Sequence, residues 1–377
     1  MTPSQTPTTI RDYPALLDQD LAPNSSRFND LALELFRFQA QANPLYARFL
    51  KGIGCVPEAV SDVQAIPALP IAFFRTHTVL TAPWVAATGV SGEGVADTGV
   101  SGEGVAALPG RGITFTSSGS TSATASRHYV PDPARYEDAF LRGFQRAYGN
   151  PASWTFLFLL PAYLEREGSS LIYMCRELAA RSLQPETGFF LHDHEALLQR
   201  AVASLARRQP TMLLGVSFAL LDLAEQMGAD SPANSKLTHF SLLNSDLLTV
   251  VETGGMKGRR REMLREELHA TLCAGLGVSA IHSEYGMTEL LSQAWSRGQG
   301  RFTCPPWMRV RLRDLNDPLS AAAAGSVGAL DVLDLANGHS CAFIATDDLG
   351  RMHPDASFEV LGRLDASDVR GCNLLVS

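Results

Sequence analysis

Residues 280–289 read Ala-Ile-His-Ser-Glu-Tyr-Gly-Met-Thr-Glu, a short apolar start followed by polar side chains around one glycine. We expect a strand over Ala280–Ser283 and a loop over Glu284–Glu289. The same order, an apolar run next to an amphipathic stretch, repeats from about residue 110 onward. Such alternation favours parallel or mixed sheets whose faces are covered by helices. Ligands of these sheets bind in the loops that follow the strands, where we expect each motif below to lie.

The remaining elements are predicted from apolar spacing. The other expected strands are Ile113–Thr116, Thr155–Leu160, Thr211–Val216, Leu247–Glu252, Gly328–Leu333 and Cys341–Thr346. The expected helices are Arg27–Phe49, Pro133–Ala147, Ser169–Ser182, Glu195–Arg207, Phe218–Met227 and Gly258–Ala274. Asn24, Ser25 and Ser26 offer capping oxygens for the first of these helices.

The glycine of the opening stretch lets the chain turn tightly and gathers three kinds of side chain around one cavity. There Tyr285 can stack on a purine, Thr288 can donate to a phosphate, and Glu289 can hold Mg²⁺ beside phosphate oxygens. The other interpretation is a glycine turn followed by the first turn of a helix, where the dipole favours Glu289.

A second motif, Phe-Thr-Ser-Ser-Gly-Ser-Thr-Ser, occupies residues 115–122 directly after a predicted strand. Its hydroxyls and approachable backbone N–H groups are the donors that a polyphosphate needs. It is not a Walker P-loop, because the pattern GxxxxGK[ST] is absent. Such composition is also typical of an ordinary solvated loop.

A third motif, Thr346-Asp-Asp-Leu-Gly350, precedes Gly362-Arg-Leu-Asp365. A carboxylate can accept from both hydroxyls of a ribose, so this pattern suits a nucleoside. The alternative is a hairpin in which Asp and Gly residues only make turns.

The bulk composition excludes several function classes. Apolar residues make up 45% of the 377 residues. The net charge of −8 disfavours a nucleic-acid partner held by phosphate contacts. We find no signal-peptide pattern and no apolar run long enough for a membrane span, which requires about 18 residues. The six cysteines form no CxxC pair, so neither disulfides nor structural zinc are indicated and a reducing cytoplasm fits best.

Two stretches of the sequence contain histidines that could form a site. His192 and His194 flank Asp193, which is better interpreted as a helix N-cap than as part of a metal site. His282 lies beside the Tyr-Gly motif, where it either lines an acyl pocket or is an ordinary core histidine.

The order of the three motifs resembles the adenylate-forming superfamily of acyl-CoA synthetases, peptide-synthetase adenylation domains and luciferases. Several further segments resemble the LuxE-type acyl-protein synthetases, which are long-chain fatty acid–protein ligases. These segments are residues 160–166, 169–174, 254–258, 284–289 and 370–375. The resemblance implies an α/β fold like the N-terminal domain of adenylate-forming enzymes, with mixed sheets covered by helices and the C-terminal lid domain essentially absent.

By that resemblance the chain divides into an N-terminal helical segment over 1–65, an adenylate-forming core over 66–361, and a truncated hinge and tail over 362–377. Residues 98–106 repeat residues 88–96 identically, and we interpret 88–106 as a duplicated flexible loop.

The resemblance also implies the roles of individual residues. The β- and γ-phosphates of ATP would be cradled by Thr116, Ser117, Ser118, Gly119, Ser120 and Thr121. Gly254 and Gly255 would border the adenine, on which Tyr285 would stack after the Gly286 turn. Thr288 would contact the α-phosphate and Glu289 the Mg²⁺, while Asp348 would hold the ribose hydroxyls with Arg363 nearby.

Lys257 and Cys372 are candidates for two further catalytic roles that the family resemblance implies. No lysine follows the hydroxyl loop and no lid lysine is present, so Lys257 is our candidate for charge on the α-phosphate. The alternative is a solvated lysine that starts a basic helix. LuxE-type enzymes pass the acyl group to a cysteine near the C-terminus, and Cys372 fits this role because Arg370 would favour its thiolate.

The resulting expectation is an ATP- and Mg²⁺-dependent ligase that makes a fatty (carboxylic) acyl-AMP. It then passes the acyl group to Cys372 and on to a partner such as an acyl reductase or another acceptor protein. Two alternatives remain, an acyl-CoA ligase of the phenylacetate-CoA ligase type and a non-catalytic nucleotide- or acyl-binding subunit.

Overall fold

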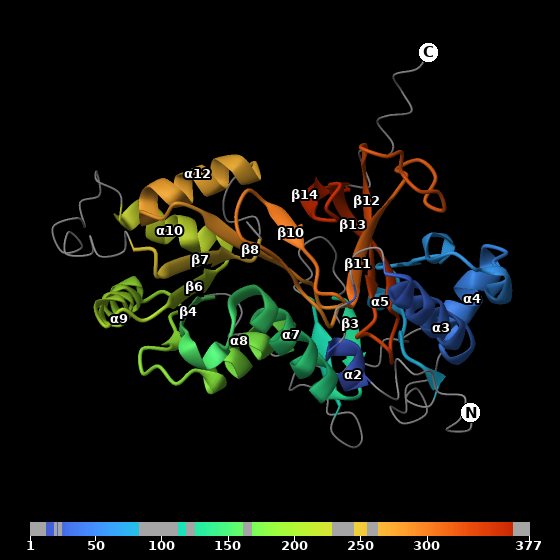
Figure 1. Cartoon of the computed structure of the whole chain (residues 1–377), viewed down its shortest axis with the longest axis horizontal. Coiled ribbons are helices and arrows are strands. Elements are labelled where there is room, and N and C mark those ends of the chain that lie inside the picture. The colour runs from blue at the N-terminus through green and yellow to red at the C-terminus, as the bar shows by residue number, and fades with distance from the viewer. Residues whose placement is uncertain are drawn as a thin grey trace, which may run out of the picture. The chain divides into compact units, whose positions relative to one another are not determined.

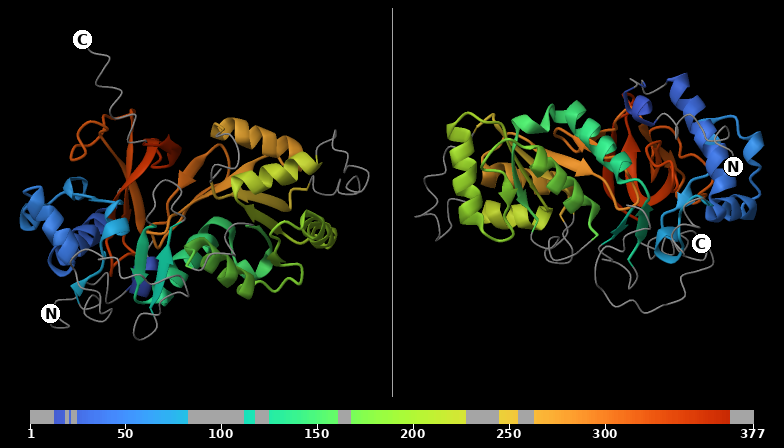
Figure 2. Two further views of the ribbon diagram at one scale, coloured as in Figure 1. Left: turned by 180° about the vertical axis from the view of Figure 1, so that it is seen from behind. Right: turned by 90° about the horizontal axis from the view of Figure 1, so that it is seen from below.

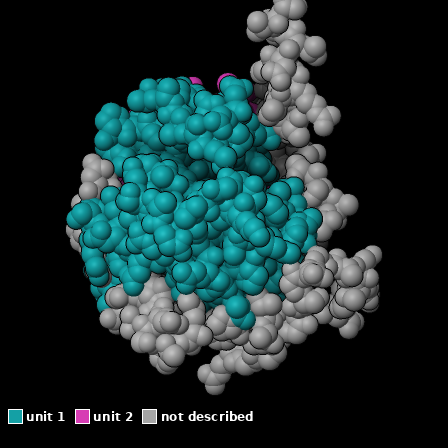
Figure 3. All heavy atoms as spheres, turned by 90° about the vertical axis from the view of Figure 1, so that its right-hand side faces the viewer, with its two compact units in different colours: residues 1–140, 287–292, 304–377 teal, residues 141–286, 293–303 magenta. Residues whose placement is uncertain are grey.

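A computed structural model describes residues 13–18, 21, 25–82, 112–117, 125–160, 168–227, 245–254 and 263–364 of the chain. The chain forms two compact units (Figure 3). Unit 1 comprises residues 1–140, 287–292 and 304–377, and unit 2 comprises residues 141–286 and 293–303. Within the described ranges, no helix has the length and apolar character needed to cross a membrane.

Unit 2 is built on a mixed sheet with strand order β10-β9-β8-β7-β6-β4-β5. Strands β5, β4, β6, β7 and β8 are parallel, and β9 and β10 are antiparallel to their neighbours. The bounds are β4 Thr155–Leu159, β5 Gly188–Phe189, β6 Thr211–Gly215, β7 Leu248–Glu252, β8 Ile281–Tyr285, β9 Ala294–Ser296 and β10 Arg301–Thr303. Every residue of β4 and β6 is buried, as expected for central strands covered on both faces.

Helices α10 (Ser217–Met227) and α12 (Arg265–Leu276) cover one face of this sheet, and α8 (Ser170–Arg181) and α9 (His194–Ala206) the other (Figures 1 and 2). The 3-10 turn η4 spans Pro151–Ser153. Helix α7 spans Pro133–Tyr148 and so begins within the residues of unit 1 and ends within those of unit 2.

Unit 1 holds an antiparallel run β11-β12-β13-β14, to which β1 adds a short parallel pairing with β13. A separate hairpin consists of β2 and β3. The strand bounds are β1 Leu69–Pro70, β2 Ile113–Thr116, β3 Arg127–Val130, β11 Met308–Arg313, β12 Val327–Asp334, β13 Phe343–Met352 and β14 Phe358–Arg363. The helical elements are α2 Tyr13–Asp18, α3 Ser26–Ala42, α4 Pro44–Gly52, η2 Pro57–Ala59, η3 Val63–Ala65 and α5 Phe73–Thr76.

The first predicted helix, Arg27–Phe49, is wrong as a single element because the chain breaks at Asn43. The Asn43 side chain accepts from the backbone N–H groups of Leu45 and Tyr46, both at 3.1 Å, and so caps α4. Pro44 occupies the first turn of α4, where its missing N–H costs nothing. Ser25 is the N-cap residue of α3, but its side chain makes no capping hydrogen bond, contrary to expectation.

The seven predicted strands and the mixed sheet covered by helices are confirmed, with two corrections of position. Glu284 and Tyr285 were expected in the loop after a strand, but they lie inside β8. Residues 346–350 were expected in a loop after a strand, but they lie inside β13, which continues to Met352. The turn to β14 comes later, where the N–H of His353 donates to the carbonyl of Ser357 at 2.8 Å. The duplicated stretch 88–106 lies outside the described residues.

Candidate active site

The stem of the hydroxyl-rich loop is closed by two hydrogen bonds in unit 1. The N–H of Ser117 donates to the carbonyl of Ser126 at 3.0 Å, and the N–H of Ser126 donates to Oγ of Ser117 at 2.8 Å. Thr116 pairs with Arg127 at the end of the β2–β3 hairpin. The structure thus brings Thr116 and Ser117 to the mouth of the predicted loop; Ser118, Gly119, Ser120 and Thr121 lie outside the described residues.

The predicted Mg²⁺ ligand lies beside this stem. Glu289 is buried, with 3% of its surface exposed. Burial raises the pKa of this carboxyl, whereas the Ser126 side chain and the charges of Arg75 and Arg363 act in the opposite direction. A buried carboxylate therefore adjoins the hydroxyl loop, although 163 residues separate Glu289 from Ser126 (289 − 126).

Two residues that sequence reasoning missed hold the Thr288–Glu289 backbone. Nδ1 of His128, in β3, lies 2.8 Å from the carbonyl oxygen of Thr288, so Nδ1 carries the proton and donates. Asn337 donates through Nδ2 to the carbonyl of Glu289 at 2.9 Å. Burial lowers the pKa of His128 to about 4, an effect partly offset by the Thr288 carbonyl and by Asn337, so the ring is neutral at pH 7. No local sequence signal marks either residue.

Asp334, at the end of β12, fixes the residues that follow Glu289. Its carboxylate accepts from the N–H groups of Leu291 and Ser292 at 2.9 Å each, and from Oγ of Ser292 at 2.6 Å. Trp307 donates through Nε1 to the same Ser292 oxygen at 2.9 Å. This network holds residues 288–292 in a turn followed by β9, so the alternative expectation of a helix after Glu289 is wrong.

The structure also brings together the two residues expected at the ribose. Asp348 in β13 is directly paired with Arg363 in β14, and Nε of Arg363 lies 3.2 Å from Oδ1 of Asp348. Thr346 accepts from the Asp348 N–H through Oγ1 at 3.1 Å, which fixes the backbone below the carboxylate. The Arg363 side chain is 57% exposed and that of Asp348 is 11% exposed.

In unit 2, Gly254 follows β7 with φ of +75°, a conformation that favours glycine. Its N–H donates to Oε2 of Glu252 at 2.6 Å, and the other carboxylate oxygen accepts from Arg265 at 2.7 Å. Ser217, at the start of α10, donates to the same carboxylate at 3.1 Å. Burial alone would raise the pKa of Glu252, but the hydrogen bond with His269 and the Arg265 charge lower it to about 2. Glu252 was not singled out from the sequence, and it anchors the segment predicted to border adenine.

Tyr285 is the last residue of β8, and Gly286 follows it. The Tyr285 ring packs against Phe302 with centroids 5.8 Å apart at 61°, and 8% of its surface is exposed. A Cβ on Gly286 would lie 2.3 Å from Oε1 of Glu284, so a larger residue would require the Glu284 side chain to move. Burial and the Glu252 charge raise the pKa of Glu284 to about 8, which keeps this carboxyl largely neutral at pH 7.

The histidines of unit 2 behave as structural residues. His282 stacks on Tyr148 with centroids 5.7 Å apart, and its Nδ1 lies 3.1 Å from the Tyr148 hydroxyl. Burial and the Arg297 charge lower the pKa of His282 to about 4. Asp193 is confirmed as the N-cap of α9, because its side chain accepts from the N–H of Ala196 at 2.9 Å.

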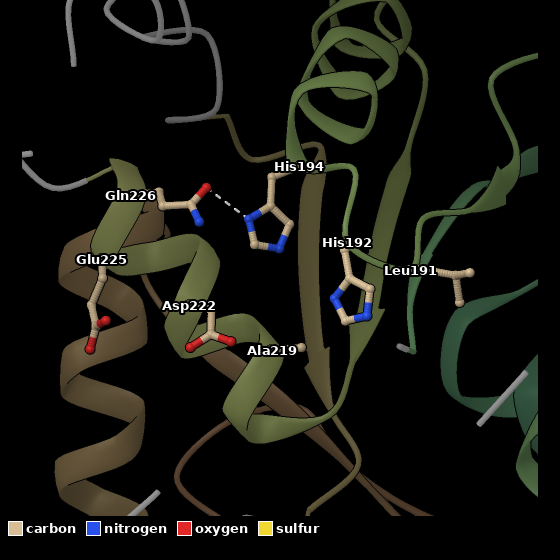
Figure 4. Close-up of a pocket in the computed structure, with 7 residues that line it drawn as sticks. All are labelled: Leu191, His192, His194, Ala219, Asp222, Glu225 and Gln226. Atoms are coloured by element: carbon tan, nitrogen blue, oxygen red, sulfur yellow. Dashed lines mark hydrogen bonds between the residues drawn. The ribbon is translucent and has the colours of Figure 1, made fainter. Parts of the chain in front are cut away.

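His192 and His194 line a pocket of about 480 Å³ with Leu191, Ala219, Asp222, Glu225 and Gln226 (Figure 4). Nδ1 of His194 lies 2.8 Å from Oε1 of Gln226, as the dashed line in Figure 4 marks. Over the described ranges, no three His, Cys, Asp or Glu side chains are arranged to hold a metal ion.

Besides residues 118–121, the predicted site residues Gly255, Lys257 and Cys372 lie outside the described residues. Their roles stay predictions.

Comparison with known proteins shows which sequences and folds the chain resembles. The family model of the LuxE acyl-protein synthetases matches residues 196–377. A long-chain-fatty-acid–luciferin-component ligase of Aliivibrio fischeri is 23% identical over 204 residues, which are 50% of this chain and 52% of that protein. The chain thus spans about half the length of this curated relative.

Solved structures resemble the chain over most of its length. Two crystal structures of 2-hydroxyisobutyryl-CoA ligase with 2-HIB-AMP and CoA match at TM-scores of 0.58 and 0.60, with 13% and 12% identity. The matches cover 97% and 92% of this chain, and 74% and 70% of the ligase. Residues 196–377 therefore match the LuxE acyl-protein synthetase family, as the sequence motifs predicted, and the chain has the fold of adenylate-forming enzymes.

Proposed function

We propose that the chain activates a fatty or other carboxylic acid as its acyl-AMP, using ATP and Mg²⁺, and then transfers the acyl group to Cys372. The observation that carries this proposal is the junction of two distant motifs in unit 1. Ser126 hydrogen-bonds to Ser117 at the stem of the hydroxyl loop, and its side chain also lowers the pKa of the Glu289 carboxyl. The residues proposed to hold phosphate and the carboxylate proposed to hold Mg²⁺ therefore belong to one unit, which supports adenylation.

The donor set fits Mg·ATP. Mg²⁺ is commonly held by one or two carboxylates together with substrate phosphates, so a single buried carboxylate beside hydroxyl groups is a suitable protein contribution. When bound, the ion neutralises phosphate charge and makes pyrophosphate a better leaving group. In our proposal Glu289 holds the ion, Thr288 contacts the α-phosphate, and residues 116–121 cradle the β- and γ-phosphates.

The adenine and the ribose of the nucleoside are each assigned to their own residues. We assign the ribose hydroxyls to Asp348, whose carboxylate is oriented by Arg363 and by the Thr346 contact to its backbone. Gly254 and Gly255 would border the adenine, and Tyr285 would stack on it. The Glu252 anchor on the Gly254 N–H supports a fixed backbone at this position.

Two half-reactions follow. A carboxylate oxygen attacks the α-phosphorus, the bond to the bridging oxygen between the α- and β-phosphates breaks, and pyrophosphate leaves with that oxygen. The Cys372 thiolate, having lost its proton to solvent, then attacks the acyl carbonyl. The bond to the AMP oxygen breaks, so the products are an enzyme thioester and AMP. Lys257 is proposed to offset charge on the α-phosphate in the first step.

The substrate and acceptor are proposed from the sequence relationship. The curated relative is named as a ligase of long-chain fatty acids, which supports a fatty acid as the substrate class here. Delivery from Cys372 to an acyl-reductase or another acceptor protein completes the proposed cycle.

The deciding experiment incubates the protein with Mg·ATP and a chain-length series of labelled fatty acids, followed by intact-protein mass spectrometry. Wild type should gain one acyl group with at least one acid, and Cys372→Ser should gain none while it still exchanges pyrophosphate into ATP. Cys55→Ser, at a half-buried cysteine, is the matched control and should behave as wild type.

Other outcomes would change the assignment. If wild type forms no protein adduct but converts coenzyme A to its acyl thioester, and Cys372→Ser does so equally well, the acceptor is coenzyme A. If no acid supports pyrophosphate exchange or an adduct, the chain is a binding subunit and the proposal is wrong.

A further inference from the structure

The short helix α5 is fixed on one side to the strand that carries Asp348. Immediately before α5, Leu69 and Pro70 pair with Ile344 and Ala345 of β13. The N–H of Ile71 adds a hydrogen bond to the carbonyl of Ala345 at 2.9 Å. Since Ala345 precedes Asp348 by three positions on the same strand, the start of α5 is held near the proposed ribose contact.

On its other side, α5 packs against the residues that hold the Thr288 backbone. The Phe74 ring lies edge-on to the His128 ring, with centroids 5.7 Å apart at 90°. Phe74 is 1% exposed, and His128 in turn binds the Thr288 carbonyl at 2.8 Å. Helix α5 therefore lies between the proposed ribose-binding strand and the Thr288–Glu289 pair, all within unit 1.

Arg75 follows Phe74 in this helix. Its side chain is half-buried, and its charge acts on the buried carboxyl of Glu289. Arg363 also acts on that carboxyl but is engaged by Asp348. Within the described part of the chain, the Arg75 guanidinium forms no ion pair or hydrogen bond. Among the described residues, the guanidinium thus has no partner for its donors, and its charge acts on the carboxylate proposed to hold Mg²⁺.

We propose that Arg75 is a phosphate-binding residue of the adenylation site, where its guanidinium donates to the β- and γ-phosphate oxygens of ATP. This inference rests on the proposed function. The hydroxyl loop is not followed by a lysine, and the ATP polyphosphate carries more negative charge than one Mg²⁺ neutralises. An arginine presents a planar set of donors that matches two phosphate oxygens. When the α–β bond breaks, Arg75 would remain with the departing pyrophosphate and stabilise its charge.

The competing interpretation is that Arg75 only balances Glu289. In that case, replacing Arg75 would change the dissociation constants of ligands with and without a pyrophosphate group by the same factor. The decisive quantity is therefore the ratio of the dissociation constant of AMP to that of Mg·ATP, which does not depend on how much of a preparation is folded.

The test measures calorimetric binding of Mg·ATP, Mg·pyrophosphate and AMP to wild type, Arg75→Gln, Arg75→Lys and Arg37→Gln. Arg37 is the matched control, an exposed unit 1 arginine that donates to the Val60 carbonyl. Arg75→Gln should weaken the binding of Mg·ATP and Mg·pyrophosphate by about tenfold or more, because the hydrogen bonds of a charged group contribute at least this factor to affinity. Its AMP affinity should stay within about twofold. Arg75→Lys should recover part of the loss because it keeps the charge, and Arg37→Gln should match wild type.

Equal losses for ATP and AMP, or no loss in Arg75→Gln, would overturn the role of Arg75. The proposed function fails separately. If wild type binds Mg·ATP with the expected dependence on Arg75 but forms no acyl product with any acid, the reaction is wrong and the phosphate contact stands. If wild type forms acyl adducts while Arg75→Gln binds Mg·ATP as well as Arg37→Gln does, only the Arg75 assignment falls. No binding of Mg·ATP to wild type would overturn both.

Discussion

Arg363 lies directly opposite Asp348 in the antiparallel β13–β14 pair, and its Nε is 3.2 Å from Oδ1 of the carboxylate. The arginine is largely exposed, so the pair adds at most about 1 kcal/mol to stability. Its contact fixes the direction in which the carboxylate points. In the proposed function, the Arg363 contact therefore orients the Asp348 carboxylate as an acceptor for the ribose hydroxyls.

Asp348→Asn should consequently weaken ATP and AMP binding equally, by about tenfold, because both ligands carry the ribose. This pattern is opposite to that expected for Arg75→Gln. Calorimetry with both nucleotides provides the measurement, and Asp347→Asn, at the neighbouring carboxylate, is the control. An effect on ATP alone would show that Asp348 does not bind the ribose.

The sequence predicted the local parts of this site and missed the long-range ones. Strand ends next to glycine and hydroxyl residues were visible because a strand and the loop after it are neighbours in sequence. His128, which lies 160 residues before its partner Thr288, carries no local mark of that contact. The same is true of Asp334, which binds Ser292 across 42 residues. The break at Asn43 was missed because apolar spacing continues through it, although an Asn-Pro pair favours a new helix start.

Glu289→Gln should raise the Mg²⁺ concentration that gives half-maximal pyrophosphate exchange by about tenfold, because an amide is a weaker ligand for a hard cation. Burial raises the pKa of Glu289, despite the opposing effects of Ser126, Arg75 and Arg363. Magnesium requires the ionised carboxylate, so wild type should lose Mg²⁺ affinity on acidification at a higher pH than an ordinary glutamate would. Titrations of Mg²⁺ at several pH values test this, with Glu58→Gln as the control. An unchanged Mg²⁺ requirement in Glu289→Gln would exclude this residue as the ligand.

Glu252→Gln should destabilise the protein at pH 7 by about 3 kcal/mol, because it leaves Arg265 without its buried partner. Burial opposes ionisation of Glu252, but His269, Arg265, Ser283 and the Gly254 N–H lower its pKa from 4.5 to about 2. A depressed folded-state pKa contributes stability above pH 4.5, and this stability is lost as the pH falls toward 2. The difference in the free energy of unfolding between wild type and Glu252→Gln, measured with urea, should therefore become smaller as the pH falls from 4.5 toward 2. The exposed Glu266→Gln is the control, and a difference that stays constant with pH would contradict the assignment.

Glu284→Gln should show the opposite pH dependence. Burial and the Glu252 charge raise the pKa of Glu284 to about 8, against 4.5 for an ordinary glutamate. A raised carboxyl pKa gives stability that is fully present below pH 4.5 and is lost as the pH rises through 8. The free energy of unfolding of Glu284→Gln should thus equal that of wild type at low pH and exceed it by about 2 kcal/mol at pH 9. The gain is limited to this size because the Glu284 side chain is only partly buried. The gain should shrink when Glu252 is also replaced by Gln, and urea unfolding of the four proteins measures it. A gain independent of pH would mean that the Glu284 charge does not matter.

Two helical glycines should respond in opposite ways to alanine. A Cβ on Gly275, in α12, would lie 2.6 Å from Cβ and 2.9 Å from the carbonyl oxygen of Ala224 in α10, whereas a Cβ on Gly143, in α7, meets no atom within 4 Å. Alanine lowers the cost of ordering a helix by about 1 kcal/mol, so Gly143→Ala should stabilise the protein by up to that amount. Gly275→Ala should destabilise the protein, because the added methyl group forces α12 and α10 apart at a cost of about 1–3 kcal/mol, which outweighs the same gain. Urea unfolding of both variants at one pH compares them directly. Stabilisation of Gly275→Ala would show that α10 and α12 have room to move apart, and the close contact at Ala224 would then not limit this position.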